Sequence, residues 1–284
     1  MRTKQLVVVV AAAAALLVTT SGAWAQELPA SGDDAVARLD ASPRHGEWVK
    51  YVAAGGDSVL AWVVYPERSD KAPVVVVIHE IYGLSDWIRG VADQLAAEGF
   101  IAIAPDLLSG KGPDGGGTES VDRQGAVALV RALDAGEVKM RLDAAAEYAM
   151  SLPAARSGFA VIGFCWGGST SFRYATEQPN LGAAVVYYGS SPASEALVNV
   201  EAPVLGLYGG DDARVNATIP AAEEEMNRLG KRYELEIYEG AGHGFLRQQS
   251  GREGANMRAT EQAWQRVVAF LKAELGLAGP NRRH

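Results

Sequence analysis

The stretch VIGFCWGG, residues 161–168, decides the interpretation of this 284-residue sequence. A run of branched apolar residues, which is typical of a buried strand, leads into a cysteine with glycines on both sides. Cys165 is the only cysteine of the chain, so it cannot form an internal disulfide. A lone thiol is either a reactive group or a small buried hydrophobic residue, and the surrounding sequence must decide between the two.

Around this stretch, strand-like segments alternate with helix-like segments. PVVVVIH (73–79) is a continuous β-branched run, typical of a strand buried on both faces. The alternation predicts an α/β fold with an open, mostly parallel sheet that helices cover on both faces. The expected strands are 47–52, 59–66, 73–79, 100–105, 159–163, 182–189, 202–210 and 233–240, the first two as a hairpin. The expected helices are 86–98, 121–133, 137–150, 221–229 and 256–275, with one more directly after the cysteine.

Two segments fall outside this alternation. DLLSGKGPDGGGTES (106–120) is too rich in glycine to hold regular structure. Residues 26–46 are polar and contain Pro, Gly and Asp, so we expect them to form a loose N-terminal arm. A single domain is expected over residues 47–284, because the pattern shows no internal repeat and no second hydrophobic core is needed at this length.

Residues 1–25 have the pattern of a secretory signal peptide. Two basic residues are followed by an apolar run over 6–18 and by the small-x-small cleavage site AWA at 23–25. The apolar run is too short for a typical spanning helix, although a retained membrane anchor is the alternative. We therefore expect an exported protein, periplasmic or secreted, whose mature chain begins at Gln26 and has no membrane association.

The charge balance argues against several kinds of partner. The whole chain has 26 Lys and Arg residues against 34 Asp and Glu residues. Residues 1–25 contain two of the basic and none of the acidic residues, so the mature net charge is 24 minus 34, or −10. An acidic chain of this kind is not expected to bind nucleic acid or anionic membranes.

The sequence also lacks the patterns that hold cofactors. Neither a His-x-x-x-His pair nor a carboxylate cluster with ligand spacing is present, so no metal is expected. GKGPDGGG (110–117) is not followed by the Lys-Ser/Thr pair of a phosphate-binding loop, so no nucleotide is expected either. The sequence therefore predicts that no cofactor is required.

The pattern Gly-x-Cys-x-Gly between a buried strand and a helix is that of a nucleophile elbow. Such a turn places its nucleophile at the C-terminal edge of the sheet, as in the α/β-hydrolase fold. Gly163 and Gly167 leave room where the strand and the helix cross. The helix that begins near Trp166 points its amide groups at the thiol, which favours the thiolate.

A thiol nucleophile needs a base, and the base needs an orienting acid. Of the four histidines, His243 lies in the loop between the last strand and the last helix, where this fold places its histidine. The strand over 202–210 leads into Asp211 and Asp212, and an acid on the loop after that strand can reach the imidazole. The order Cys165, Asp212, His243 satisfies the chain order nucleophile, acid, histidine.

Four blocks give the chain a resemblance to a known family: HEIYGL (79–84), GFCWGG (163–168), GGDDARV (209–215) and GAGHGFLR (240–247). Together they resemble the dienelactone hydrolases, which are α/β-hydrolases with a Cys-Asp-His triad. The resemblance covers residues 50–275 and implies a carboxylic ester or lactone hydrolase that acts on a small, carboxylate-bearing molecule.

The resemblance also implies roles for residues around the thiol. The family pattern Asp-x-x-Val favours Asp212 as the triad acid, with Asp211 as the alternative. Glu80 matches the family glutamate that lies against the cysteine and tunes its protonation. The backbone N–H groups of Ile81 and Trp166 would form the oxyanion hole.

Two arginines bind the substrate carboxylate in this family. Arg247, four residues after the histidine, matches one of them, and Arg123 matches the other more loosely. The family aromatic residue one turn further on is Val127 here, which leaves the substrate open. An esterase or thioesterase of the same fold is therefore one alternative, and a non-catalytic exported binding protein is another, against which the complete triad argues.

Overall fold

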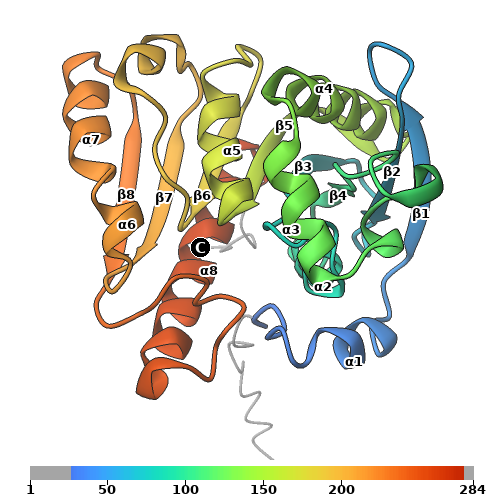
Figure 1. Cartoon of the computed structure of the whole chain (residues 1–284), viewed down its shortest axis with the longest axis horizontal. Coiled ribbons are helices and arrows are strands. Elements are labelled where there is room, and N and C mark those ends of the chain that lie inside the picture. Colours follow the sequence, from blue (N-terminus) through green and yellow to red (C-terminus); the bar gives the residue numbers. More distant parts are fainter. Residues whose placement is uncertain (1–26, 278–284) are drawn as a thin grey trace, which may run out of the picture.

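The computed structural model in Figure 1 describes residues 27–277, and the expected signal peptide lies outside this range. Its centre is one eight-stranded sheet with the order β1-β2-β4-β3-β5-β6-β7-β8. β1, β2 and β4 pair antiparallel, and the pairs from β4 through β8 are parallel, which confirms the predicted α/β class. The strands are β1 (Gly46–Val52), β2 (Ser58–Val64), β3 (Ala72–Ile78), β4 (Ile101–Pro105), β5 (Ala155–Phe164), β6 (Ala183–Tyr187), β7 (Val204–Gly209) and β8 (Tyr233–Tyr238).

Helices cover both faces of this sheet (Figure 1). Hydrophobic residues of α2 and α8 pack on one face, and residues of α4, α5 and α7 pack on the other. Because successive side chains of a strand point to opposite faces, β3 contributes Val75 and Val77 to the first layer and Val74 and Val76 to the second. The α-helices are α1 (Ala35–Asp40), α2 (Asp86–Ala97), α3 (Arg123–Ala132), α4 (Ala135–Ser151), α5 (Trp166–Ala175), α6 (Ala213–Asn216), α7 (Ile219–Arg228) and α8 (Ala255–Glu274).

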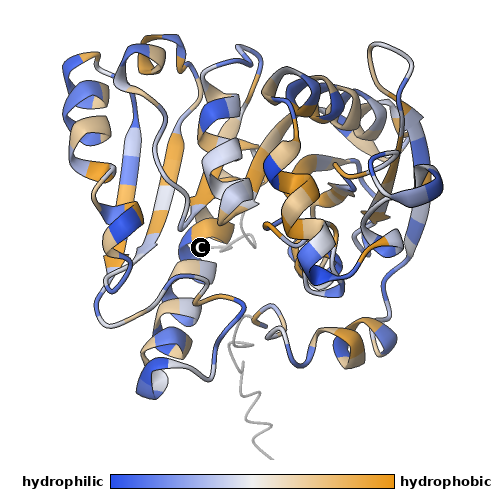
Figure 2. Cartoon of the chain, in the orientation of Figure 1, coloured by the Kyte–Doolittle hydropathy of each residue, from blue (hydrophilic) through white to orange (hydrophobic). Residues whose placement is uncertain are grey.

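The distribution of hydropathy follows from this layering. Figure 2 shows hydrophobic residues on the central strands and hydrophilic residues on the outer helical surfaces. The edge strand β8 is more polar, since Glu234 and Glu236 alternate along it. Charged side chains of this kind discourage pairing of an exposed edge with another chain.

The segment before β1 is not the loose arm that the sequence predicted. It contains α1 and packs against α2 and the loop between β8 and α8. The Trp87 indole donates to the carbonyl of Ala30 at 3.1 Å, and the Arg44 guanidinium donates to Asp93 at 3.0 Å. The polar residues of this segment are held by partners that are distant in the sequence. Its local composition is therefore the same as that of a loop, although the segment is ordered by these contacts.

The glycine-rich connection between β4 and α3 contains only two short 3₁₀ turns, η1 (Pro113–Gly115) and η2 (Thr118–Ser120). The Asp106 carboxylate holds it together, because it accepts hydrogen bonds from the backbone of Leu108 and from both the backbone and the hydroxyl of Thr118. The connection is therefore irregular, as predicted, but tied to the end of β4.

Candidate active site

The turn between β5 and α5 holds Cys165 in a conformation that few side chains adopt. Its backbone angles are φ 56° and ψ −114°, a strained region for a residue other than glycine. A Cβ on Gly163 would lie 1.9 Å from the carbonyl oxygen of Gly167. A Cβ on Gly167 would lie 2.4 Å from the carbonyl oxygens of Ile78 and His79. The glycines thus let α5 cross close to the ends of β3 and β5, which exposes the thiol at the sheet edge.

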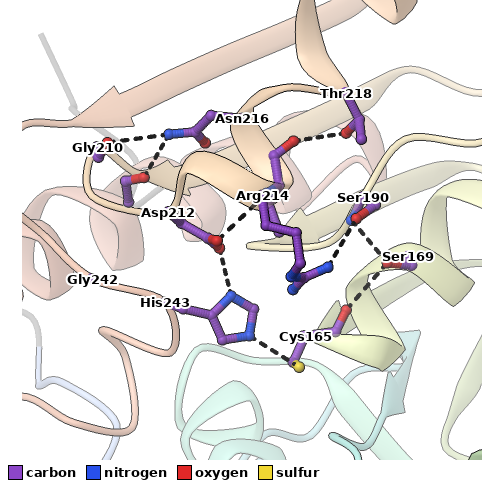
Figure 3. A network of polar contacts seen from close by, with 12 residues as sticks. Cys165, Ser169, Ser190, Gly210, Asp212, Arg214, Asn216, Thr218, Gly242 and His243 are labelled. Carbon is purple, nitrogen blue, oxygen red and sulfur yellow. Dashed lines mark hydrogen bonds and ion pairs between the residues drawn. The ribbon is translucent and has the colours of Figure 1, made fainter.

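A continuous chain of polar contacts begins at this thiol (Figure 3). The Sγ of Cys165 lies 3.0 Å from Nε2 of His243, and Nδ1 of the same ring lies 2.5 Å from Oδ2 of Asp212. The Asp212 side chain is only 8% exposed and also accepts a hydrogen bond from the backbone N–H of Val215. A buried carboxylate in this position orients the imidazole so that its Nε2 can accept a proton from the thiol.

The structure separates the two neighbouring aspartates. Asp211 forms an ion pair with Arg252 at 2.8 Å, and both side chains are about half exposed. The Asp212 carboxylate instead contacts Nδ1 of the His243 imidazole. The two residues are adjacent in the sequence, but only the second contacts His243 in the part of the chain that the structure describes.

The thiol is harder to ionise than the sequence predicted. Burial raises the pKa of Cys165 to about 11, and the negative charges of Glu80 and Asp212 act in the same direction. The backbone N–H of Trp166 does lower this pKa, as the helix-dipole argument expects, and Arg214 adds to that effect. Burial and the nearby carboxylates outweigh both, so the net shift of the thiol pKa is upward.

Glu80 lies at the end of β3, is 3% exposed, and accepts a hydrogen bond from Nε of Arg247 at 2.8 Å. Burial raises the pKa of the Glu80 carboxyl, and the arginine opposes that shift. Glu80 and Arg247, which the sequence matched to family residues, therefore form a partly buried ion pair near the thiol.

The two amide groups expected to form the oxyanion hole belong to the segments that follow β3 and β5, which are neighbouring strands. Trp166 is the first residue of α5, so its N–H has no partner in the helix. Ile81 follows Glu80, and its N–H takes part in none of the backbone hydrogen bonds of residues 27–277. Neither N–H therefore has a backbone acceptor among residues 27–277, and that of Trp166 lies within reach of the Cys165 sulfur.

His79 supports this arrangement, and the sequence analysis assigned it no role. Its ring is buried, and Nδ1 donates to the backbone carbonyl of Glu80 at 2.7 Å. The ring also stacks on Trp166, with centroids 5.5 Å apart. Burial lowers the pKa of this histidine, which keeps it neutral. A histidine at the end of an entirely apolar strand was the available signal.

Arg247 and Arg123 lie together in a cavity of about 500 Å³ that Glu80, Tyr82 and Ser85 also line. The Arg123 guanidinium carbon lies 3.6 Å from the Tyr82 ring centroid, and that of Arg247 lies 5.5 Å from it. Cation–π contact with one aromatic ring therefore holds both cations at the same site. Tyr82 was not predicted from the sequence, where an aromatic residue two positions after Glu80 was the available signal.

Two further properties concern the described residues as a whole. From residue 27 to residue 277, no helix is both long enough and apolar enough to cross a membrane. Within the same range, the His, Cys, Asp and Glu side chains form no group of three or more that could hold a metal ion.

The sheet, the elbow and the His243 loop define the class as that of α/β-hydrolase-fold enzymes. The family model for the dienelactone hydrolase family matches residues 59–275, and the chain belongs to this family. It is thus a hydrolase of the ester or lactone type.

Proteins similar to this one in sequence or in structure match most of its length. A Salmonella typhimurium protein assigned as a carboxymethylenebutenolidase is 31% identical over 241 residues, which span 80% of this chain and 87% of the relative. A Saccharolobus solfataricus protein with the same assignment is 33% identical over 248 residues, which span 76% and 95%. A crystal structure from Klebsiella pneumoniae, assigned as a dienelactone hydrolase, is 28% identical with a TM-score of 0.70, covering 83% of this chain and 99% of that one.

Proposed function

We propose that this hydrolase cleaves carboxylate-bearing esters or lactones through a thioester on Cys165. The observation that carries the proposal is the contact chain from Sγ through the His243 imidazole to the buried Asp212 carboxylate. The relatives assigned as carboxymethylenebutenolidases support a lactone as the substrate class.

In the first half of the reaction, Nε2 of His243 takes the thiol proton as Sγ attacks the carbonyl carbon. The new C–S bond converts the carbonyl oxygen to an oxyanion, which accepts hydrogen bonds from the N–H groups of Ile81 and Trp166. The C–O bond to the alcohol then breaks, and the imidazolium returns its proton to the departing oxygen. In a lactone this step opens the ring and leaves the alcohol attached to the acyl group.

In the second half, a water molecule replaces the alcohol. Nε2 of His243 takes a proton from the water, whose oxygen attacks the thioester carbon. The C–S bond of the resulting tetrahedral intermediate breaks, the thiolate recovers the proton, and the carboxylic acid leaves. Asp212 stabilises the imidazolium that forms in each half of the cycle.

Arg247 and Arg123 are the groups proposed to bind the substrate carboxylate. Arg247 uses Nε to bond Glu80, which fixes the guanidinium and leaves its terminal nitrogens for a second carboxylate. Arg123 has no carboxylate partner among residues 27–277. Two cations held at one aromatic ring suit a small anionic group, although the chain as a whole is acidic.

We further propose that the enzyme is exported. The support is the basic start, the apolar run over 6–18 and the AWA site at 23–25. Edman sequencing or intact mass of the protein from its host should give Gln26 as the first residue, and a soluble fraction that retains Met1 would contradict export by cleavage.

The test of the chemistry uses Cys165→Ala with nitrophenyl butyrate as the substrate. Loss of the nucleophile should reduce kcat by about 10⁴-fold, and iodoacetamide should inactivate the wild type but not change the variant. Trapping of an acyl group on the wild type by rapid acid quench, detected by mass, identifies the thioester. Retained turnover in Cys165→Ala would contradict the proposed nucleophile.

The test of substrate charge uses Arg247→Ala, with Arg252→Ala as a surface control. The readout is the ratio of kcat/KM for nitrophenyl hemiglutarate, which carries a carboxylate, to kcat/KM for neutral nitrophenyl butyrate. Removal of a charge-assisted pair should lower this ratio by about 10–100-fold in Arg247→Ala. An unchanged ratio would favour an esterase or thioesterase with an unrelated substrate, and a wild type inactive on every ester would favour a binding protein.

A further inference from the structure

Arg214 lies on the other side of the nucleophile from Arg247 and Arg123. Cys165 follows β5, and β5 lies between β3 and β6 in the sheet. The cavity with Glu80 and Tyr82 is on the β3 side. Arg214 belongs to the short helix α6, which follows β7, and its side chain points toward Ser190, which follows β6 (Figure 3). The site therefore has cations on both sides of the thiol.

The Arg214 side chain has no strong partner of its own. Its Nη1 lies 3.5 Å from the hydroxyl of Ser190, at the limit of a hydrogen bond. Among the carboxylates of residues 27–277, none forms an ion pair with it. The guanidinium is nevertheless close enough to Cys165 to lower the pKa of the thiol. An arginine near the reacting sulfur, with free donors, can bind an anion on a substrate.

A second cavity is lined by Ser190, the residue that the Arg214 guanidinium contacts. It has a volume of about 450 Å³ and extends between α5 and the chain after β6, with Trp166, Ser169 and Ser190 among its lining residues. The Ser169 hydroxyl accepts a hydrogen bond from the backbone of Ser190 at 2.8 Å and contacts the carbonyl of Cys165. The cavity thus adjoins the reaction centre through Trp166, the residue after the nucleophile, and through Ser169.

Two polar groups among the lining residues of this cavity have only weak partners. The Ser191 hydroxyl and Nε of Arg173 are buried, and within residues 27–277 neither forms a hydrogen bond. The nearest carboxylate to Arg173 is Glu177, at a loose 3.7 Å. Buried polar groups without partners are costly, so a polar ligand in the cavity would satisfy them.

We propose that Arg214, with Ser190 and this cavity, forms a second anion subsite, and that the substrate is an ester or lactone with a carboxylate on each side of the scissile bond. This inference deepens the proposed function and rests on it. Arg247 and Arg123 bind one carboxylate. Arg214 binds the other, so it determines specificity for dicarboxylates over monocarboxylates.

The experiment uses four esters that differ only in charge. They are nitrophenyl butyrate, nitrophenyl hemiglutarate with a carboxylate on the acyl side, carboxynitrophenyl butyrate with a carboxylate on the leaving group, and carboxynitrophenyl hemiglutarate with both. Values of kcat/KM give two preference ratios, one for each carboxylate position. These ratios are measured for the wild type, Arg214→Gln, Arg247→Ala and the control Arg131→Gln, which removes an exposed arginine near the end of α3.

The proposal expects the wild type to prefer the ester with both carboxylates. Arg214→Gln should lower one of the two preference ratios by about tenfold, as the loss of an exposed charge-assisted contact predicts. Arg247→Ala should lower the other ratio, and Arg131→Gln should change neither. Arg214→Lys, which keeps the charge, should recover part of the lost preference.

Several outcomes would overturn the inference. If Arg214→Gln reduces all four rates equally, its charge acts on the thiol and not on the substrate. If it lowers the same ratio as Arg247→Ala, the two arginines serve one carboxylate. A wild type without a preference for a second carboxylate would also overturn it. Failure of the proposed function looks different, because the wild type would then hydrolyse none of the esters, or Cys165→Ala would remain active.

Discussion

Replacement of Asp212 by Asn, compared with the same change at Asp211, tests the contact chain most directly. The two positions are adjacent, and each change removes one negative charge without changing the size of the side chain. In the structure only the second carboxylate contacts His243 Nδ1, at 2.5 Å, while the first pairs with Arg252 at the surface. The pair of variants therefore separates an effect on the imidazole from an effect of local charge.

The expected magnitude follows from the tautomer of His243. With the carboxylate present, Nδ1 carries the ring proton and Nε2 is free to accept the proton of the thiol. The amide of an asparagine can donate to Nδ1, which favours the tautomer with the proton on Nε2. Such a ring cannot act as the base, and loss of this function costs about 10³–10⁴-fold in kcat, or roughly 4–5.5 kcal/mol. Asp211→Asn breaks a half-exposed ion pair, so its effect should stay below about twofold.

The assay is kcat and kcat/KM for nitrophenyl butyrate between pH 6 and pH 9, with the Tm of each variant as a check on folding. Because the ring remains in place, Asp212→Asn should fold normally, and KM should change less than kcat. A loss below tenfold in a folded Asp212→Asn protein would refute the assignment. So would a larger loss in Asp211→Asn than in Asp212→Asn.

Three further predictions concern the surroundings of the site. Glu80→Gln removes a negative charge that raises the thiol pKa of about 11, so the pH profile of alkylation by iodoacetamide should move to lower pH; an unchanged or raised midpoint would contradict this. Gly163→Ala places a Cβ 1.9 Å from a backbone oxygen, so urea titrations should show a loss of about 3 kcal/mol or more in unfolding free energy. The control Gly90→Ala should be neutral or stabilising, because a Cβ there would meet no atom within 4 Å outside its own helix backbone. Asp93→Asn breaks the mostly buried ion pair with Arg44 that holds the segment before β1, so it should cost about 1–3 kcal/mol of unfolding free energy. The surface control Asp70→Asn should cost little, and equal losses in the two variants would show that the segment is not held by this pair.

Much of the fold was predictable because its signals are local. Continuous apolar runs such as 73–79 identify strands buried on both faces, and the structure has a fully buried β3 there. The elbow was predictable for the same reason, since glycines on either side of a nucleophile are required wherever a strand turns sharply into a helix. The chain order of Cys165, Asp212 and His243 followed from the order of the strands that carry them.

Local signals predicted the ends of helices and the first residues of strands less accurately. β5 begins at Ala155, and its first part pairs with β3 across an irregularity in the register that includes Gly158 at φ 92°. The sequence placed the start of this strand at 159, because the residues before it lack an apolar pattern. The N-terminal segment was misjudged in the same way, since its order depends on Asp93 and Trp87 far along the chain.

The sequence by itself determined the α/β class, the nucleophile elbow and the order of the expected catalytic residues, because these depend on burial and backbone geometry within a few residues. Only the tertiary structure decided which aspartate contacts the His243 imidazole. It also decided that the Arg123 and Arg247 guanidinium groups both contact the Tyr82 ring, and that the Arg214 side chain lies on the other side of the thiol. It also decided the direction in which the pKa of Cys165 shifts, because burial and Glu80 outweigh the backbone N–H of Trp166. Distances between charges and their exposure to water are set by segments far apart in the chain, so no local pattern could have predicted them.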